Sequence, residues 1–469
     1  MRAASWSSIF YLITTDILGP FNAPFAISQV GWVPGIVLYC VNALSIILVG
    51  LAALYCGLIL WRLFIRLDSQ KYPVRTYADI AERLLGNGAR HVCTVLQTIQ
   101  LIVNVGTICL ANGQALSQIS KSRLCFSVCI VVWALAGMIV GQIRTLKSYG
   151  WLANSSVWIH LLIIFISMGV AAHSPPNFEA AHRAFGTPQG PVETHAFEPL
   201  ALNNKVNGIM NMVFAYGGAM IFPEMVNQSL TQLQQNLNFH MHQDGRNEAP
   251  DGLLERNAYL LYGAFIYAFQ GQFTLGLAYQ GLSIFSWQTV CNALSLVTGL
   301  IAAGLYGNIE VIYINIVEGW LNGPHLLSRT GRLVWTLVVY WSLAFVIGSA
   351  IPQIQTISAL IAAIAIMQFS YSFPLLLRVT YDVMTDAMVA DKEYVPGLGT
   401  SGRIDTWRHW SRWRRGMFSG RWYFKLFNFL AGLAALAMAC LGMWGAGKTI
   451  RMTFVRANAT TSFGCNPPV

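Results

Sequence analysis

The stretch DILGPFNAPF, residues 16–25, decides the fold of this chain because it cannot form a regular helix. It lies inside the first long apolar segment, residues 6–30, which is long enough to cross a bilayer. Pro20 and Pro24 lack a backbone N–H and clash with the preceding turn, so the helix should break within residues 19–23. Irregular backbone at bilayer depth is tolerated only where protein buries it or where it lines a cavity. We therefore expect a broken first helix; the alternative is a plain proline kink.

A second apolar segment has the same design. The run FAYGGAMIFPE, residues 214–224, interrupts an apolar span over residues 206–228 with two adjacent glycines and a proline. Two interrupted segments in corresponding positions of two halves indicate a transporter site built on inverted repeats. Asp16 in the first segment supports this interpretation, because an intramembrane carboxylate is costly and usually faces a pathway or a partner.

The composition places the chain in a membrane. Of its 469 residues, 55% are hydrophobic and 10% are charged, and the mean hydropathy is +0.52. A soluble domain carries about 25% charged residues. The net charge of +10 comes mostly from loops, so it indicates membrane topology and no nucleic-acid partner.

We expect an all-α polytopic membrane protein with 11 transmembrane helices. The first ten form a five-plus-five inverted repeat in which broken helices 1 and 6 open the two halves, and an extra eleventh helix follows. The expected spans are 6–30, 34–61, 91–116, 124–141, 149–172, 206–228, 258–279, 288–318, 333–351, 354–377 and 425–447. The transporter domain is then 1–447, with repeat one at about 6–172, repeat two at about 206–377 and an extracytoplasmic tail at 448–469.

The charge distribution predicts the orientation. With the N-terminus in the cytoplasm, cytoplasmic segments hold 22 of the 29 Lys and Arg residues. The tail would then be extracytoplasmic, where the glycosylation sequon at Asn458 would have meaning. The membrane is the plasma membrane or the vacuolar membrane.

Segments between the spans also carry signals. Thr76 caps an amphipathic interfacial helix over residues 76–85, and residues 173–205 indicate an ordered extramembrane loop. The Trp-rich basic run 407–422 is typical of an interfacial anchor beside anionic lipid. Most of the nine cysteines lie in apolar spans and none has metal-ligand spacing, so we expect no metal and no cofactor.

At this point the residues resemble a known family. Residues 19–35 and 214–224 look like the first and sixth helices of the amino acid/auxin permease family, within the amino acid–polyamine–organocation superfamily. Residues 306–308 (Tyr-Gly-Asn) are similar to its eighth helix, and residues 72–79 and 113–118 look like fungal members. The resemblance implies a leucine-transporter-like fold and secondary active transport of amino acids by alternating access.

The chain departs from the family at two places. Many relatives carry a glutamate near the position of Asp16. Many also carry a lysine shortly after the Tyr-x-Asn of helix eight, where this chain has Ile312 with Glu310 nearby. Asp16 and Glu310 are the acids placed deep in spans, and they are our coupling candidates.

An amino acid needs donors for its carboxylate and acceptors for its ammonium. Unwound backbone at the start of a half-helix offers N–H groups, and carbonyls freed in helix six offer acceptors. Asn104 belongs to a polar stripe with Gln97 and Gln100. The candidate substrate-binding residues are Gly19, Phe21, Asn22, Ala23, Asn104, Phe214, Ala215, Tyr216, Gly217, Gly218 and Asn308. Phe21, Tyr216 and Asn308 are equally compatible with packing.

We expect a proton to drive transport rather than sodium. Helix eight around residues 302–312 offers no Ser or Thr for a sodium ion, whereas Asp16 beside the break can exchange a proton. Sodium held by Asn308 and backbone carbonyls stays open. His160, in the middle of span five, is interpreted as a packing residue.

Other classes of function fit less well. No Ser/His/Asp set or cysteine nucleophile motif is visible, so we expect no enzyme. A non-transporting amino acid sensor, or transceptor, on the same fold is the alternative function.

Overall fold

A computed structural model describes residues 20–40, 49–69, 71–140, 146–221, 223, 250–306, 329–389, 391, 405–455 and 462–468. Within these ranges the chain is all-helical and has no β-strand. Its α-helices are α2 (Ala23–Val30), α3 (Trp32–Cys40), α4 (Val49–Leu67), α5 (Tyr77–Leu85), α6 (Asn87–Ile119), α7 (Phe126–Val140), α8 (Leu146–His173), α9 (Phe178–Phe185), α10 (Leu202–Ala215), α12 (Pro250–Gln270), α13 (Phe285–Tyr306), α15 (Arg329–Ala350), α16 (Ile354–Ile361), α17 (Phe373–Val389), α18 (Trp410–Phe418) and α19 (Trp422–Val455). Short 3-10 helices are η1 (Pro20–Asn22), η2 (Gly217–Ile221), η3 (Gly271–Phe273) and η4 (Ala278–Gly281), and η6 (Ala362–Ile366) and η7 (Gln368–Ser372) are π-helical.

Several helices have the length and composition of membrane spans. Among the described residues, five helical stretches qualify: Asn87–Ile119, Asn154–His173, Phe285–Ala303, Ile354–Val389 and Trp422–Val455. Large apolar side chains on these and other helices face outward, such as Phe165 at 68% exposed and Leu261 at 65%. A bilayer covers such surfaces at no cost, so the fold is that of a polytopic membrane protein.

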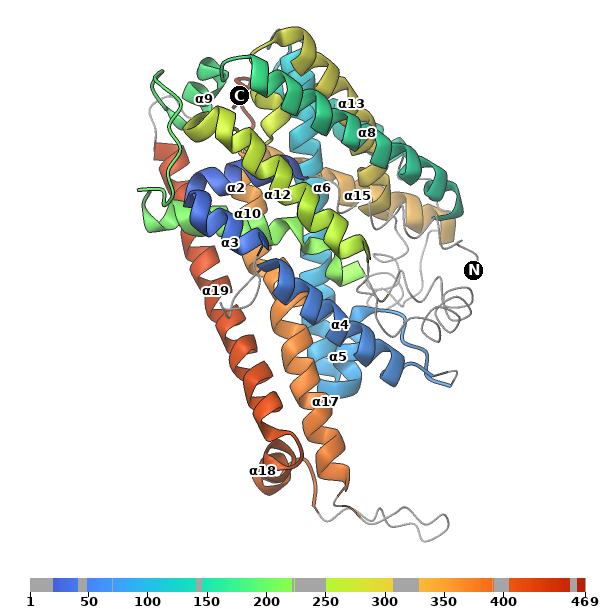
Figure 1. Ribbon diagram of the computed structural model, residues 1–469. Coiled ribbons are helices and arrows are strands. Elements are labelled where there is room, and N and C mark those ends of the chain that lie inside the picture. Colours follow the sequence, from blue (N-terminus) through green and yellow to red (C-terminus); the bar gives the residue numbers. More distant parts are fainter. Residues whose placement is uncertain are drawn as a thin grey trace.

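Helix α6 runs through the middle of the molecule and organises two groups of helices (Figure 1). The α6 group consists of α6, α7, α13 and α15, which pack on one another. The α10 group consists of α2, α10 and α12. Helix α16 contacts both α6 and α10 and so lies between the groups.

Glycines explain how closely α6 and α15 approach. A Cβ added to Gly106 would lie 2.9 Å from the Ala344 carbonyl oxygen, and one added to Gly348 would lie 2.6 Å from the Gly106 carbonyl oxygen. Small residues at such crossings let backbones pack directly in a membrane. The two helices therefore form a rigid pair.

The molecule has two distinct ends (Figure 1). The α9 end contains α9 and the C-terminal segment, residues 462–468. The α18 end contains α18 and the adjoining ends of α17 and α19. We keep these two names below.

Two expectations about segments between spans are confirmed. Helix α5 has a complete capping box: Thr76 Oγ1 accepts from the Asp79 N–H at 3.2 Å, and Asp79 Oδ2 accepts from the Thr76 N–H at 3.0 Å. The structure describes residues 173–205 throughout and places helix α9 in them, capped by Asn177. The Thr76 cap is a local sequence feature, which is why the sequence predicts it, whereas the Asn177 cap was not predicted.

Span ends differ from expectation where tertiary contacts intervene. Helix α12 ends at Gln270 instead of continuing to 279, because Gly271 takes φ 49° and a Cβ there would lie 2.4 Å from the Glu193 carbonyl oxygen. The tenth expected span extends beyond residue 377, since α17 reaches Val389 and packs against α18 and α19. Such ends depend on neighbours that are distant in sequence.

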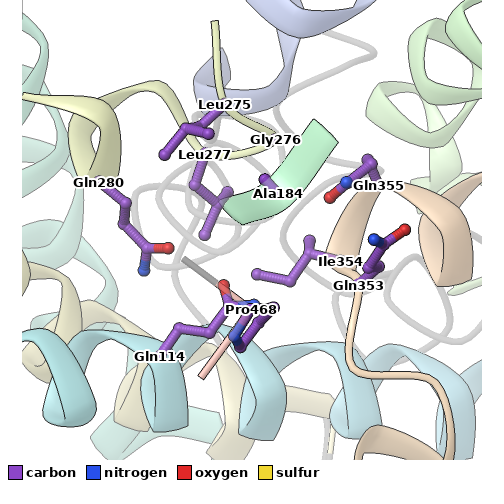
Figure 2. Close-up of a pocket in the computed structure, with 10 residues that line it drawn as sticks. All are labelled: Gln114, Ala184, Leu275, Gly276, Leu277, Gln280, Gln353, Ile354, Gln355 and Pro468. Atoms are coloured by element: carbon purple, nitrogen blue, oxygen red, sulfur yellow. The ribbon is translucent and has the colours of Figure 1, made fainter. Parts of the chain in front are cut away.

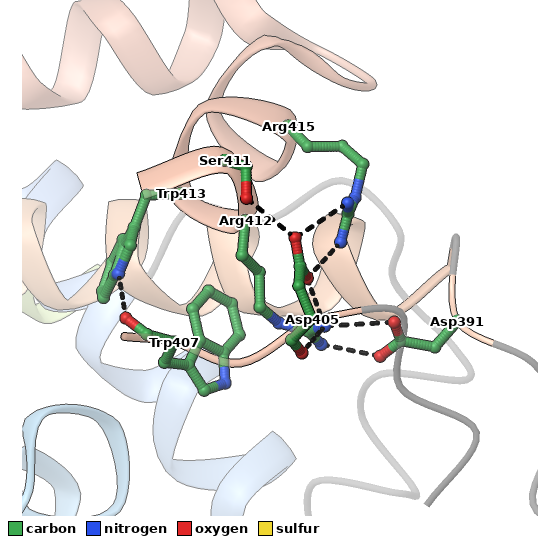
Figure 3. A network of polar contacts seen from close by, with 7 residues as sticks. All are labelled: Asp391, Asp405, Trp407, Ser411, Arg412, Trp413 and Arg415. Atoms are coloured by element: carbon green, nitrogen blue, oxygen red, sulfur yellow. Dashed lines mark hydrogen bonds and ion pairs between the residues drawn. The ribbon is translucent and has the colours of Figure 1, made fainter. Parts of the chain in front are cut away.

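Ion pairs hold the α18 end together (Figure 3). Arg412, whose side chain is fully buried, pairs with Asp391 at 2.6 Å and with Asp405 at 3.1 Å. Arg415 also pairs with Asp405, at 2.8 Å. Hydrogen bonds from Arg415, and then from Arg412, lower the pKa of Asp405 to about 2. Asp405 therefore stays ionised throughout the physiological pH range.

Candidate functional site

The predicted interruption of the sixth span is present in the structure. Helix α10 ends at Ala215, and the chain tightens into the 3-10 helix η2 from Gly217. Tyr216 between them donates its N–H to the Val213 carbonyl at 3.0 Å. Two adjacent glycines have the poorest helix propensity after proline, which explains why the α-helix stops here.

The carbonyls around this break are held by side chains from other elements. Gln100 Nε2 donates to the Gly217 carbonyl at 3.2 Å, and Gln97 Nε2 donates to the Met220 carbonyl at 3.2 Å. Ser370 Oγ, from η7, donates to the Tyr216 carbonyl at 3.0 Å. The polar stripe of α6 thus binds carbonyls of η2 and fixes the position of the break.

The first interrupted segment lies beside α10. Asn22 Nδ2 donates to the Asn211 carbonyl at 3.3 Å, one turn before α10 ends. Ala23 is buried in the same apolar cluster against which Ala215 and Tyr216 pack. The described residues of the first segment are 3-10 helical over η1 and α-helical from Ala23. The start of α2 and the end of α10 are therefore neighbours.

Aromatic and titratable side chains surround Phe21. Its ring centroid lies 4.9 Å from that of Tyr279, 5.8 Å from that of Tyr262 and 5.7 Å from that of His160. His160 Nδ1 is buried and has no hydrogen-bond partner among the described residues. The sequence interpretation of His160 as a packing residue thus missed its place beside a candidate site residue. The available signal was an ionisable side chain in mid-span.

Four buried amide oxygens without partners belong to elements that adjoin the break. Within the described part of the chain, these are Asn104 Oδ1 and Gln100 Oε1 of α6, Asn211 Oδ1 of α10 and Gln368 Oε1 of η7. Asn104 lies one turn after Gln100, on the same face of α6. Buried polar groups in proteins almost always have a partner, so such a cluster requires an explanation. An ammonium group, which has only donors to offer, would satisfy these acceptors.

Several predicted site residues lie outside the described residues. These are Asp16, Gly19, Asn308 and Glu310. The structure brings together Phe21, Asn22 and Ala23 with Ala215 and Tyr216, and places Gln100 and Asn104 on the helix that holds the break. Ser370 and Gln368, in a polar run of the tenth span, were not predicted to belong to the site.

An all-helical, multi-pass membrane protein whose interrupted helix is lined by polar side chains has the architecture of a secondary transporter. The transmembrane amino acid transporter family matches residues 2–381, and the chain belongs to that family. A relative from Neurospora crassa, the N amino acid transport system protein, is 22% identical over 391 residues, which are 79% of this chain and 74% of the relative. The resemblance noted from the helix motifs is thereby confirmed at the level of the family.

Proposed function

We propose that this protein is a secondary active transporter that moves amino acids across a membrane by alternating access. The observation that carries this proposal is the break between α10 and η2, together with buried amide acceptors without partners on the adjoining elements α6, α10 and η7. Family membership supports an amino acid as the ligand. A zwitterion supplies both an ammonium for those acceptors and a carboxylate for backbone donors.

Each end of the substrate has a place in this arrangement. The carboxylate binds the backbone N–H groups of Phe21, Asn22 and Ala23 with Gly19, where the N-terminal end of α2 has positive potential. The ammonium binds near Asn104 and the carbonyls of residues 214–218. Phe21, packed against Tyr279, lines the pocket for the substrate side chain. Asn308 completes the site from the eighth span.

The architecture we propose has 11 spans, with a five-plus-five inverted repeat within residues 1–447 and a tail at 448–469. The disulfide between Cys125 and Cys465 supports this count and orientation. Spans four to eleven separate Cys125 from Cys465, and these eight crossings, an even number, put both residues on the same side. Disulfides persist on the oxidising side of a membrane, which is where a cytoplasmic N-terminus puts both residues.

Transport is coupled to a proton, with Asp16 and Glu310 as the groups that exchange it. His160 beside Phe21 is an additional titratable group at the site. Sodium is the competing ion, and a non-transporting amino acid sensor in the plasma or vacuolar membrane is the competing function. Uptake measured with and without sodium, and with and without a pH gradient, separates all of these.

The experiment on the site compares two glycines. A Cβ at Gly217 would lie 3.0 Å from Ile366 Cδ1, whereas a Cβ at Gly169 of α8 meets nothing within 4 Å. Gly217→Leu should abolish amino acid uptake in transporter-deficient cells while the protein still reaches the membrane, and Gly169→Leu should retain uptake. Normal uptake by Gly217→Leu would mean that the break between α10 and η2 is not part of the substrate-binding site.

A further inference from the structure

The C-terminal segment, residues 462–468, is attached along the α9 end by successive contacts. Ser462 Oγ donates to the Ala350 carbonyl at 2.7 Å, and the Phe463 N–H donates to the Ser349 carbonyl at 3.1 Å. The Phe463 ring also contacts Phe345, at 6.1 Å between centroids. These contacts fix the segment to the end of α15.

The next two residues attach the segment to α7. The Gly464 carbonyl accepts from Ser127 Oγ at 2.8 Å, and the Cys465 carbonyl accepts from the Phe126 N–H at 3.0 Å. Cys465 is also bonded to Cys125 by the disulfide. Helices α7 and α15 both belong to the α6 group, so the disulfide and the hydrogen bonds tie the segment to that group.

Beyond the disulfide the chain turns into the protein. Cys465 and Asn466 are exposed, but Pro468 is buried. It lines a cavity whose polar side chains come from α6 (Gln114), η4 (Gln280) and the start of α16 (Gln353 and Gln355). Figure 2 shows Pro468 among these side chains, with none of the ten lining residues charged. The space left beside Pro468 accommodates about one water molecule.

This cavity lies on the same face of α6 as the candidate site. Gln100, Asn104 and Gln114 follow the three- and four-residue spacing of one helix face. Gln114 is 14 residues after Gln100, which corresponds to roughly 21 Å along the helix. On the facing side, the Gln355 carbonyl accepts from Asn211 Nδ2 of α10 at 3.0 Å. Polar groups on α6 and α10 therefore lie between the cavity and the break.

We propose that residues 462–468 form a disulfide-tethered plug, and that the glutamine-lined cavity beneath Pro468 is the first binding point for an amino acid entering from the α9 end. The second part rests on the proposed function. Neutral amides offer both donors and acceptors to a zwitterion without holding it as tightly as charged groups. Pro468 is the third residue after Cys465, so the plug can withdraw by no more than about 10 Å. The disulfide keeps the plug at the entrance, so the return of Pro468 to the cavity is an intramolecular step.

The test measures access to the cavity directly. Gln114→Cys is introduced together with Cys440→Ser, because Cys440 is the exposed free thiol among the described residues. Labelling by a membrane-impermeant maleimide is compared between the full chain and a chain lacking residues 467–469, which retains the disulfide and its neighbouring hydrogen bonds. Gln189→Cys, exposed on the loop after α9, is the matched control.

Shortening the chain should raise the labelling rate of Gln114→Cys at least about tenfold, because it removes Pro468 from the cavity, and should leave the labelling rate of Gln189→Cys unchanged. An unchanged labelling rate of Gln114→Cys would contradict the proposal of a plug, whether or not the protein transports amino acids. A mixture of L-amino acids should slow labelling in the shortened chain, and absence of this protection overturns the entry site. Raised labelling in a protein without uptake would contradict the proposed function but not the plug.

Discussion

The α18 end and the α9 end are closed by different chemistry. At the α18 end, Arg412 is buried between Asp391 and Asp405 (Figure 3). Lys425 pairs there with Asp386. The α9 end instead has uncharged glutamines around a cavity (Figure 2). The Cys125–Cys465 disulfide also lies at this end. The stability of the α18 end therefore depends on charge, and the stability of the α9 end depends on redox state.

In the orientation we propose, the difference follows from the two compartments that a membrane separates. Basic residues accumulate on the cytoplasmic side, and those that become buried there need acidic partners. Disulfides persist on the opposite, oxidising side. Both observations favour the same orientation, with the α18 end in the cytoplasm. Each end can therefore be destabilised, by substitution or by reduction, without affecting the stability of the other end.

The largest effect is expected at the α18 end. Arg412→Ala leaves Asp391 and Asp405 without their buried partner, which should cost about 3 kcal/mol of folding free energy. Arg414→Ala, an exposed arginine on the same helix, should change it by less than about 0.5 kcal/mol. Thermal unfolding of the purified protein in detergent measures both. Equal losses for the two variants would contradict the assignment of the cluster as the element that holds this end.

A smaller effect is expected from reduction at the α9 end. Opening the Cys125–Cys465 disulfide should cost about 2 kcal/mol, because it releases a constraint between residues 340 positions apart. Unfolding with and without reductant measures this cost, and Cys465→Ser should remove the dependence on reductant. The Arg412→Ala variant should respond to reductant as the unchanged protein does. If its response differs, the two ends are coupled and the comparison fails.

The smallest effects are expected at the two helix caps. Thr76→Ala removes the cap of α5 and Asn177→Ala removes the cap of α9, each at a cost of about 1 kcal/mol. Thr76→Ser keeps the hydroxyl and should recover most of the loss. Amide hydrogen exchange should accelerate only in the helix whose cap is removed. Faster exchange throughout the molecule would mean that the cap supports more than its own helix.

Local signals in the sequence predicted part of this structure. The glycines that end α10 and the Thr76 cap act within a few residues, so the sequence alone indicates them. The polar stripe of α6 was also visible, although its role in holding the η2 carbonyls was not. The expectations for Asp16, Asn308 and Glu310 lie outside the described residues and stay predictions.

Pairings across the chain could not be predicted. Nine cysteines leave many possible disulfides, and Cys125 and Cys465 meet only because the C-terminal segment folds back across α15. His160 faces Phe21 because α8 packs beside α12 and α13, which no spacing along α8 indicates. Such contacts are decided by how helices pack, and helix packing is encoded in the whole sequence.

The most direct measurement of the central claim is uptake of a panel of radiolabelled L-amino acids by the full chain reconstituted in proteoliposomes. An inwardly directed proton gradient should drive accumulation of at least one amino acid, replacement of sodium by choline should not reduce it, and Gly217→Leu should abolish it. No uptake of any amino acid by correctly inserted protein, or uptake that Gly217→Leu leaves intact, would contradict the account.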